Sequence, residues 1–134
     1  MPNFTRFDVQ QRYIILPICV VDTSGDRQNI LALLDTGAPA TEFSDEVLVQ
    51  LGFLTQTQHA TSLAFGLQTK KYGRIILPHI EICSHTMSNL EVYVSHFDTS
   101  WDVRALIGLD FFRRFKVTVD YRAGHLITES YAVV

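Results

Sequence analysis

The chain has 134 residues, of which 47% are hydrophobic and 19% are charged, and its formal net charge is -3 at pH 7. This length suits one compact domain, and the composition is that of a globular protein and not of a disordered one. The small negative charge gives no electrostatic reason to expect nucleic acid or an anionic membrane as partner. No apolar stretch approaches the roughly 20 residues that a membrane span requires. We therefore expect a single domain over residues 1–134 with neither kind of partner.

The N-terminus and the cysteines indicate the compartment. Residues 1–8 lack the basic start and the apolar core of a signal peptide. Cys19 and Cys83 lie far apart within apolar segments, which is typical of buried thiols in a reducing compartment. A disulfide between them stays open as an alternative. The expected location is cytoplasmic.

The first part of the chain predicts a β-hairpin. Residues 13–21 are apolar and β-branched, and Pro17 indicates that this strand is bent or lies at an edge. A polar turn over 22–27 separates it from a second apolar strand over 29–34.

A loop and a short helix follow this hairpin. Residues 35–41 are punctuated by glycine and proline, and residues 44–52 predict a helix. Ser44 offers an N-cap, and Gly52 is the expected C-terminal end of the helix.

The rest of the chain reads as further strands. A second hairpin is expected from 60–67 and 70–77, turning around 65–68. The remaining expected elements are strands over 80–82, 90–94, 105–108, 116–121 and 126–128, a polar loop over 98–104 and a helical turn over 109–115. The sequence therefore predicts a mostly-β domain with one or two short helices.

One segment combines a buried strand with a carboxylate: Leu33-Leu34-Asp35-Thr36-Gly37-Ala38. A charged group at the end of such a strand is costly unless something compensates it. Two near-matches, Asp22-Thr23-Ser24-Gly25 and Asp98-Thr99-Ser100, follow no apolar strand and are interpreted as turn formers. Taken alone, Asp35 has the same second interpretation, a carboxylate bonded to the amides of its own turn.

Three landmarks resemble, in the right order, those of retropepsin-like aspartic proteases. They are the loop Asp35-Thr36-Gly37-Ala38, a hairpin suited to serve as a flap with Gly66 near its tip, and the apolar run with glycine over 105–115. The strand over 117–121 and the turn at Gly124 are similar in particular to the protease-like domain of cellular ubiquitin-shuttle proteins. The resemblance spans about residues 12–128. It implies a closed acid-protease β-barrel half that assembles as a twofold dimer.

The chemistry of this family explains why a dimer is expected. Peptide hydrolysis without a covalent intermediate needs a base to activate water and an acid to protonate the carbonyl oxygen or the leaving amine. Two neighbouring carboxylates supply both, because they do not readily ionise together, and aspartic proteases are the standard example of such a pair. This chain supplies one such residue, Asp35, so a symmetric homodimer would bring two copies together. The resemblance implies that Thr36 and Gly37 support the loop, Thr36 by reaching the opposite loop with its hydroxyl.

The predicted function is an aspartic endopeptidase that cuts an extended peptide or protein substrate at apolar residues. The residues expected to contact this substrate are Gly37, Ala38, Phe65, Gly66, Leu67 and Ile107. No cofactor and no metal is expected, because the histidines and cysteines show no ligand spacing. Two alternatives stay open. One is a weak or inactive dimeric peptide-binding module of the same fold, and the other is a monomeric β-barrel that binds a small ligand.

The sequence also departs from the family pattern. Pro39 stands where several viral members carry an acid that pairs with an arginine of the C-terminal helix, and that helix carries Asp110 here. Asp110 is interpreted as a helix N-terminal charge, so the rigidity of Pro39 is expected to hold the loop. The flap has a single glycine near its tip, and Phe65 is expected to enter the site. The apolar end 131–134 suits an interface sheet, whereas the polar segment 3–11 suits it less.

Overall fold

The computed structural model describes residues 2–55 and 71–131. Its elements in chain order are β1 (Asn3–Arg6), β2 (Ile15–Val21), β3 (Arg27–Leu34), β4 (Glu42–Ser44), α1 (Asp45–Leu51), β5 (Lys71–Ile82), β6 (His85–Ser95), β7 (Ala105–Ile107), α3 (Leu109–Phe112), β8 (Phe115–Asp120) and β9 (His125–Ser130). Within these described ranges, no helix has the length and apolar character needed to cross a bilayer. The predicted flap tip lies outside them.

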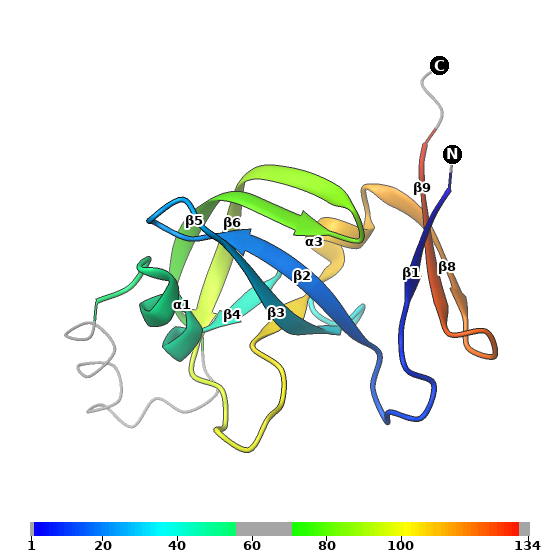
Figure 1. The fold of residues 1–134 in the computed structure, drawn as a ribbon, viewed down its shortest axis with the longest axis horizontal. Helices are drawn as coiled ribbons and strands as arrows, with labels where there is room; N and C mark the ends of the chain where they lie inside the picture. The colour runs from blue at the N-terminus through cyan, green and yellow to red at the C-terminus, as the bar shows by residue number, and fades with distance from the viewer. Residues whose placement is uncertain (1, 56–70, 132–134) are drawn as a thin grey trace.

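Six strands close a barrel in the order β2-β3-β7-β4-β6-β5 (Figure 1). The predicted first hairpin is confirmed, because β2 and β3 pair antiparallel from Ile15 opposite Leu33 to Val21 opposite Arg27. The barrel interior is filled by wholly buried side chains of strands far apart in sequence, among them Leu16, Val20, Phe43, Leu77, Ile80 and Val92. This burial supplies the main driving force for closing the barrel. The predicted mostly-β domain is confirmed.

Pro17 lies in a strand that has neighbours on both sides, although only along part of its length. β3 pairs with all of β2, whereas β5 pairs with Ile18–Val20 alone. Pro17 therefore precedes the stretch that has two neighbours, and its missing N–H leaves no gap in the β2–β5 ladder. The expected edge character is correct for Pro17 itself but not for the strand as a whole.

β5 and β6 form one long hairpin where shorter, separate strands were expected. The ladder runs from Lys71 opposite Ser95 to Ile82 opposite His85, and it skips Pro78. Asn89, on the facing strand, has a positive φ of 54°. The proline interrupts the ladder locally because it has no N–H to donate, and pairing resumes at His79. The break that proline suggests is therefore confined to one rung.

The helix α1 begins and ends where the sequence predicts. Gly52 has a φ of 89°, in the left-handed region that closes a helix. Ser44 occupies the N-cap position, but its side chain makes no capping hydrogen bond. Instead the N–H of Glu46 donates to Asp45 Oδ1 at 2.8 Å. Ser44 therefore has the expected N-cap position without the expected side-chain bond, and the side-chain acceptor in the first turn is the buried carboxylate of Asp45.

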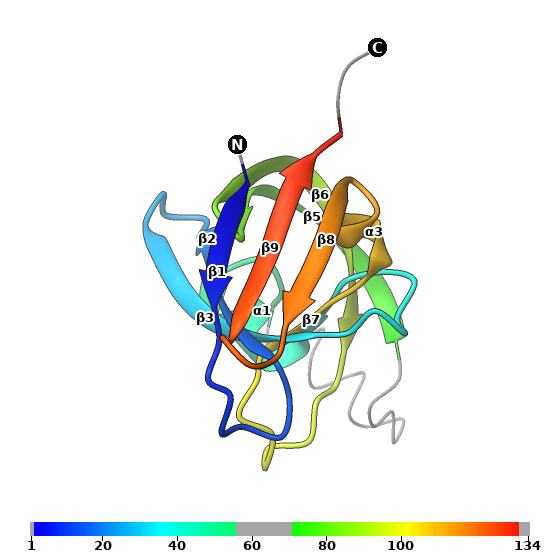
Figure 2. The ribbon, with the colours of Figure 1, turned by 90° about the vertical axis from the view of Figure 1, so that its right-hand side faces the viewer.

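The two ends of the chain form a separate three-stranded sheet in the order β1-β9-β8, which we call the terminal sheet (Figure 2). β1 pairs antiparallel with β9, from Asn3 opposite Thr128 to Arg6 opposite His125. The polar N-terminal segment, expected to suit an interface sheet poorly, is thus a strand paired within its own chain. Leu126 of β9 is wholly buried beneath this sheet.

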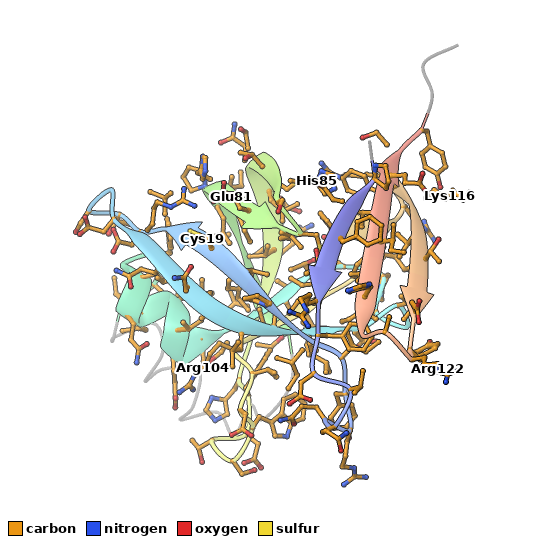
Figure 3. The ribbon with its side chains drawn as sticks, turned by 45° about the vertical axis from the view of Figure 1, so that its right-hand side comes forward. Cys19, Glu81, His85, Arg104, Lys116 and Arg122 are labelled. Atoms are coloured by element: carbon orange, nitrogen blue, oxygen red, sulfur yellow. The ribbon has the colours of Figure 1, made fainter. Side chains whose placement is uncertain are left out.

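His85 joins the barrel to the terminal sheet, and Figure 3 shows it between the two. Its Nε2 lies 2.9 Å from Thr128 Oγ1, and its ring stacks on Phe115 with 4.0 Å between centroids. Burial lowers the pKa of His85 below its usual value. The neutral imidazole is therefore the form that suits this junction.

Candidate active site

Asp35 is the first residue after β3, and hydrogen bonds define its position. Its N–H donates to the Ile107 carbonyl at 2.9 Å, and its own carbonyl accepts from the Ala38 N–H at 3.1 Å. The Gly37 N–H donates to Asp35 Oδ1 at 3.0 Å. This last bond is the one that the turn-former interpretation expects. It leaves Oδ2 without a partner among the residues that the structure describes, on a half-buried side chain.

The loop over 35–41 packs directly on the turn between β7 and α3. The Leu109 N–H donates to the Ala38 carbonyl at 2.8 Å. A Cβ atom at Gly108 would lie 2.7 Å from the Ala40 carbonyl carbon and oxygen and 2.8 Å from the Ala38 oxygen. Backbone atoms cannot yield as a flexible side chain can, so this crossing requires a residue without a side chain. Gly108, the glycine of the third landmark, is therefore required for steric reasons.

A side-chain pair braces the same loop from α3. The Thr41 N–H donates to Asp110 Oδ2 at 3.0 Å, and the Thr41 hydroxyl donates to Asp110 Oδ1 at 2.7 Å. The Thr41 hydroxyl oxygen also accepts from the Gly108 N–H at 3.2 Å. Asp110 Oδ1 accepts the Phe111 N–H as well, in keeping with its expected helix N-terminal role.

This pair corrects the expectation that Pro39 holds the loop. Pro39 is exposed, whereas Thr41 is wholly buried and bonded at both its N–H and its hydroxyl. Pro39 carries no charge, so the sequence predicts no ion pair between position 39 and the helix. Two sequence features could have predicted this pair: the acid two residues after Gly108 and the threonine that ends the loop.

The predicted site residues are distributed unevenly. Asp35, Thr36 and Gly37 lie together in one exposed or half-buried loop, and the Thr36 hydroxyl makes no hydrogen bond with any residue in the described ranges. The side chains of Ala38 and Ile107, both expected to touch substrate, are 8% and 0% exposed and belong to the interior. Three further expected contacts, Phe65, Gly66 and Leu67, lie outside the described residues.

The strand pairing points to Leu106 instead of Ile107. Parallel pairing places Leu106 beside Leu33, so their side chains share one face of the sheet. Both are half-buried, whereas their neighbours Ala105 and Ile107 point into the core.

A pocket of about 510 Å³ adjoins this face. Its lining comes from the segment before β2, from β2, β3 and the loop before β7: Gln11, Arg12, Tyr13, Ile15, Leu33, Ser100, Trp101, Asp102 and Val103. Leu33 connects the pocket to the loop, because it lies two residues before Asp35. Trp101 is 43% exposed and packs edge-on against Phe97, with 5.5 Å between the ring centroids. Sequence reasoning missed this pocket, since its parts meet only after folding.

Comparisons with known proteins agree with this geometry. The model of the gag-polyprotein putative aspartyl protease family matches residues 21–114. A retropepsin-like aspartic protease from Rickettsia conorii superposes with a TM-score of 0.62 at 18% identity, over 96% of this chain and 89% of that chain. The retroviral protease-like domain of Ddi1 from Leishmania major superposes with a TM-score of 0.53 at 17% identity, over 89% of this chain and 95% of that chain. No curated protein sequence matches the chain.

The family match covers well over half of the chain and includes the Asp35 loop, Gly108 and Asp110. The two solved structures, at their low identities, show that the fold is shared. The chain therefore belongs to the gag-polyprotein putative aspartyl protease family, and its fold is that of a retropepsin-like aspartic protease.

Proposed function

We propose that the chain is an aspartic endopeptidase that acts as a homodimer, with two copies of Asp35 forming the catalytic dyad. The observation that carries this proposal is the Asp35 loop itself. One carboxylate oxygen is held by the Gly37 N–H, and the other has no partner in the described part of the chain. In the turn at Asp22, by contrast, both carboxylate oxygens are used: Oδ1 accepts from the Ser24 and Asp26 N–H groups and Oδ2 from the Gln28 side chain.

In the proposed reaction the two carboxylates share one proton. The ionised one accepts a proton from a water molecule as that water attacks the scissile carbonyl, and the protonated one donates its proton to the carbonyl oxygen. Collapse of the resulting tetrahedral species breaks the C–N bond, and the proton gained by the base passes to the leaving amine. The carboxylate that protonated the carbonyl oxygen takes a proton back from the gem-diol as it becomes the product carboxyl group, so the dyad again holds one proton, and no covalent enzyme intermediate forms.

Rigid positioning of the loop supports this chemistry. Asp35, Ala38 and Thr41 are each tied by hydrogen bonds to the segment from Ile107 to Asp110. Two carboxylates must be held within a fraction of an ångström of the productive geometry to share a proton, so a braced loop is an advantage. Thr36 is proposed to complete the site by bonding to the opposite loop of the dimer.

The pocket favours apolar substrate residues. Leu33, Trp101 and Val103 contribute apolar surface to it, and Leu106 shares the face of Leu33. The proposed substrate contact in β7 is therefore Leu106, because Ile107 is buried. Gly37 is proposed to contact the substrate through its backbone. An extended peptide in this groove would place its apolar side chains in the pocket, with the flap closing over it.

The test compares Asp35→Asn with wild type on a diverse peptide library at mildly acidic pH. Asparagine keeps the shape of the side chain but cannot share a titrating proton, so kcat should fall about 10³-fold or more, within the range of general acid–base catalysis. The unfolding temperature should stay close to wild type. Asp22→Asn, in a turn that begins with the same Asp-Thr pair but lies at the other end of the β2–β3 hairpin, is the matched control and should cleave normally.

Three results would decide against the proposal. Undiminished cleavage by Asp35→Asn would assign the activity elsewhere. A dimer that binds library peptides and cuts none would favour the peptide-binding module, and a monomer at high concentration in sedimentation would favour the small-ligand barrel. The cytoplasmic location and the lack of a cofactor remain predictions.

A further inference from the structure

The loop over 96–104, between β6 and β7, forms one wall of the pocket, and we call it the pocket loop. It contributes Ser100, Trp101, Asp102 and Val103 to the pocket lining. Figure 1 shows this loop, in yellow, projecting beyond the barrel. The shape of a projecting loop depends on how the scaffold holds its two ends. The attachment of these ends therefore bears on the shape of the pocket.

Both ends of the pocket loop are attached to the junction of β4 and α1. At the end before β7, the Ser44 N–H donates to the Arg104 carbonyl at 2.9 Å, and the Arg104 N–H donates to the Leu31 carbonyl at 2.9 Å. At the end after β6, His96 Nδ1 lies 3.1 and 3.2 Å from the two carboxylate oxygens of Asp45. β4 lies between β6 and β7 in the barrel. Two consecutive residues thus close the neck of the loop.

The two attachments respond differently to pH. Backbone hydrogen bonds do not titrate, so the end at Arg104 is held at any pH near neutrality. The other end depends on Asp45, which is wholly buried, and on His96, whose side chain is 16% exposed. A buried carboxylate is costly unless it is hydrogen-bonded and paired with a cation. Histidine becomes such a cation in mildly acidic solution, so protonation of His96 should strengthen this attachment.

Further acids lie near the Asp45–His96 pair. Hydrogen bonds from the Ser100 N–H and hydroxyl hold the pKa of Asp98 below its usual value, and His96 acts in the same direction. Glu42 of β4 accepts the hydroxyl of Ser95, the residue before His96, at 2.7 Å. A protonated His96 therefore meets acids from α1 and from its own loop. The other charged residues of these segments are Glu46 in α1 and Asp102 and Arg104 in the loop.

The start of the pocket loop is linked to Trp101. Phe97, directly after His96, is 6% exposed, and its ring packs edge-on against Trp101 with 5.5 Å between centroids. The Trp101 N–H donates to the Asp98 carbonyl at 3.0 Å. These contacts join residues 97, 98 and 101 into one turn. A change in the position of His96 would therefore be transmitted to the Trp101 ring in the pocket.

We propose that His96 is a pH-sensitive positioning residue: when protonated, it pairs with Asp45 and holds the pocket loop, with Trp101, in the form that binds large apolar substrate residues. The inference rests on the proposed function and adds regulation of its pocket. His96 itself contacts neither the substrate nor the dyad in this proposal. As the pH rises towards neutrality the pair loses one of its charges, and a smaller fraction of molecules holds the pocket wall in place.

Fluorescence measures the pocket loop without any substrate. Trp101 is the one tryptophan of the chain, so quenching by acrylamide reports the exposure of its ring. Acrylamide is uncharged, which keeps its approach independent of the charges on the loop. In wild type, the quenching constant should be about twofold larger at pH 7.5 than at pH 5.5, because part of the population releases the ring. The NMR signals of the His96 ring should titrate with the same midpoint.

Two variants identify the pair as the cause. In His96→Asn an amide can still donate to Asp45 but does not titrate, so the quenching constant should be equal at both pH values. Asp45→Asn leaves His96 free to titrate but removes the charge that it binds, so the pH dependence should also disappear. Direct quenching of the indole by a protonated His96 would instead persist in Asp45→Asn. If that variant does not fold, the His96→Asn result and the shared midpoint in wild type decide.

The matched control is His125→Asn. It replaces a histidine of the terminal sheet, whose ring packs edge-on against Phe4. Its quenching constant should depend on pH as in wild type. Loss of the pH dependence in His125→Asn, with retention in His96→Asn, would overturn the proposal.

Kinetics provide an independent measurement. Two peptides that differ at one position, a large apolar residue in one and alanine in the other, separate the pocket from the dyad. For the first peptide KM should rise about threefold from pH 5.5 to 7.5 in wild type, as expected if about a third of the molecules keep the pocket formed. For the alanine peptide, and for both peptides with His96→Asn, KM should change little. The kcat values should follow the titration of the dyad in both proteins.

The outcomes separate this regulation from the activity. A protein that cleaves peptides while its quenching constant is the same at both pH values would overturn the role of His96 and leave the proposed function intact. A pH dependence that survives in His96→Asn would also overturn it. A pH dependence lost in both variants, in a protein that cleaves nothing, would support the role of the pair and count against the endopeptidase.

Discussion

Asp110 accepts both hydrogen bonds that Thr41 donates, from the backbone N–H at 3.0 Å and from the hydroxyl at 2.7 Å. The two residues are 69 positions apart in sequence, and Thr41 is wholly buried. Thr41 ends the loop that starts at Asp35, and Asp110 lies in α3. This pair fastens the loop to the helix, so the position of Asp35 depends on a residue far from it in the chain.

Removing the Thr41 hydroxyl should loosen this brace. In Thr41→Val the Gly108 N–H loses its acceptor at 3.2 Å and Asp110 loses its closest donor. An unpaired buried polar group costs about 1–3 kcal/mol, so the free energy of unfolding should fall by about that amount. Urea unfolding measures it, and kcat should fall with it. Thr41→Ser keeps the hydroxyl and should retain most of both; equal behaviour of the two variants would refute the brace.

A side chain at position 108 should force the two crossing segments apart. In Gly108→Ala the new Cβ would meet backbone atoms of Ala40 and Ala38 at 2.7–2.8 Å. Overpacking of this kind costs about 1–3 kcal/mol, and here it also displaces the Asp35 loop. We expect lower stability and a large loss of kcat in a peptide assay.

The control for this steric prediction is Gly73→Ala in β5. Its Cβ would meet only Val94 side-chain atoms, at 3.8 Å or more, which is ordinary contact. Its unfolding temperature should match wild type. Full activity in Gly108→Ala would show that the loop tolerates the displacement.

His85 should make stability depend on pH. Burial lowers its pKa from the usual 6.5, so the unfolded chain binds a proton more readily than the folded one. The contribution of His85 to the free energy of unfolding is therefore complete above pH 6.5 and declines as the pH falls below that value. Once the pH is below the pKa of His85 in the folded chain, the decline stops. Urea titrations between pH 7.5 and 5 should show this decline.

His85→Gln supplies the comparison. Glutamine can still bond to Thr128 but does not titrate, so the decline in stability with falling pH should be shallower than in wild type. If the free energy of unfolding depends on pH equally in the variant and in wild type, His85 is not the cause of the decline. Because the proposed dyad works at mildly acidic pH, the variant should also keep its activity to a lower pH if stability is limiting there.

The pocket residue Trp101 should affect substrate binding more than turnover. Its exposed ring lines the pocket, and among the described residues no hydrogen bond or ring pair joins it to the Asp35 loop. Trp101→Ala should raise KM for peptides with a large apolar residue by about tenfold or more, since buried aromatic anchors dominate such contacts. Steady-state kinetics would show kcat changing less than KM. Trp101→Phe should restore most of the affinity, and a pure kcat defect would contradict this role.

Local patterns account for much of what was predicted correctly. The β2–β3 hairpin, the short helix that ends at Gly52 and the apolar strand before Gly108 follow from hydrophobic runs and turn residues close together in sequence. Local patterns divided one strand into the separate stretches 70–77 and 80–82, whereas the β5–β6 ladder continues past Pro78. Alternation along β7 puts Ile107 in the core and Leu106 on the face that it shares with Leu33, which is why we propose Leu106 as the substrate contact.

The sequence by itself determined that a carboxylate follows an apolar strand and precedes a tight turn, because strand and turn propensities act over a few residues. It also determined that one chain contributes one such carboxylate. Only the tertiary structure decided what holds Asp35 in place. The Thr41–Asp110 pair, the crossing at Gly108 and the pairing of β1 with β9 join residues that lie far apart in the chain. Such contacts form when the barrel closes and buries its core, and no local pattern encodes which distant residues will then meet.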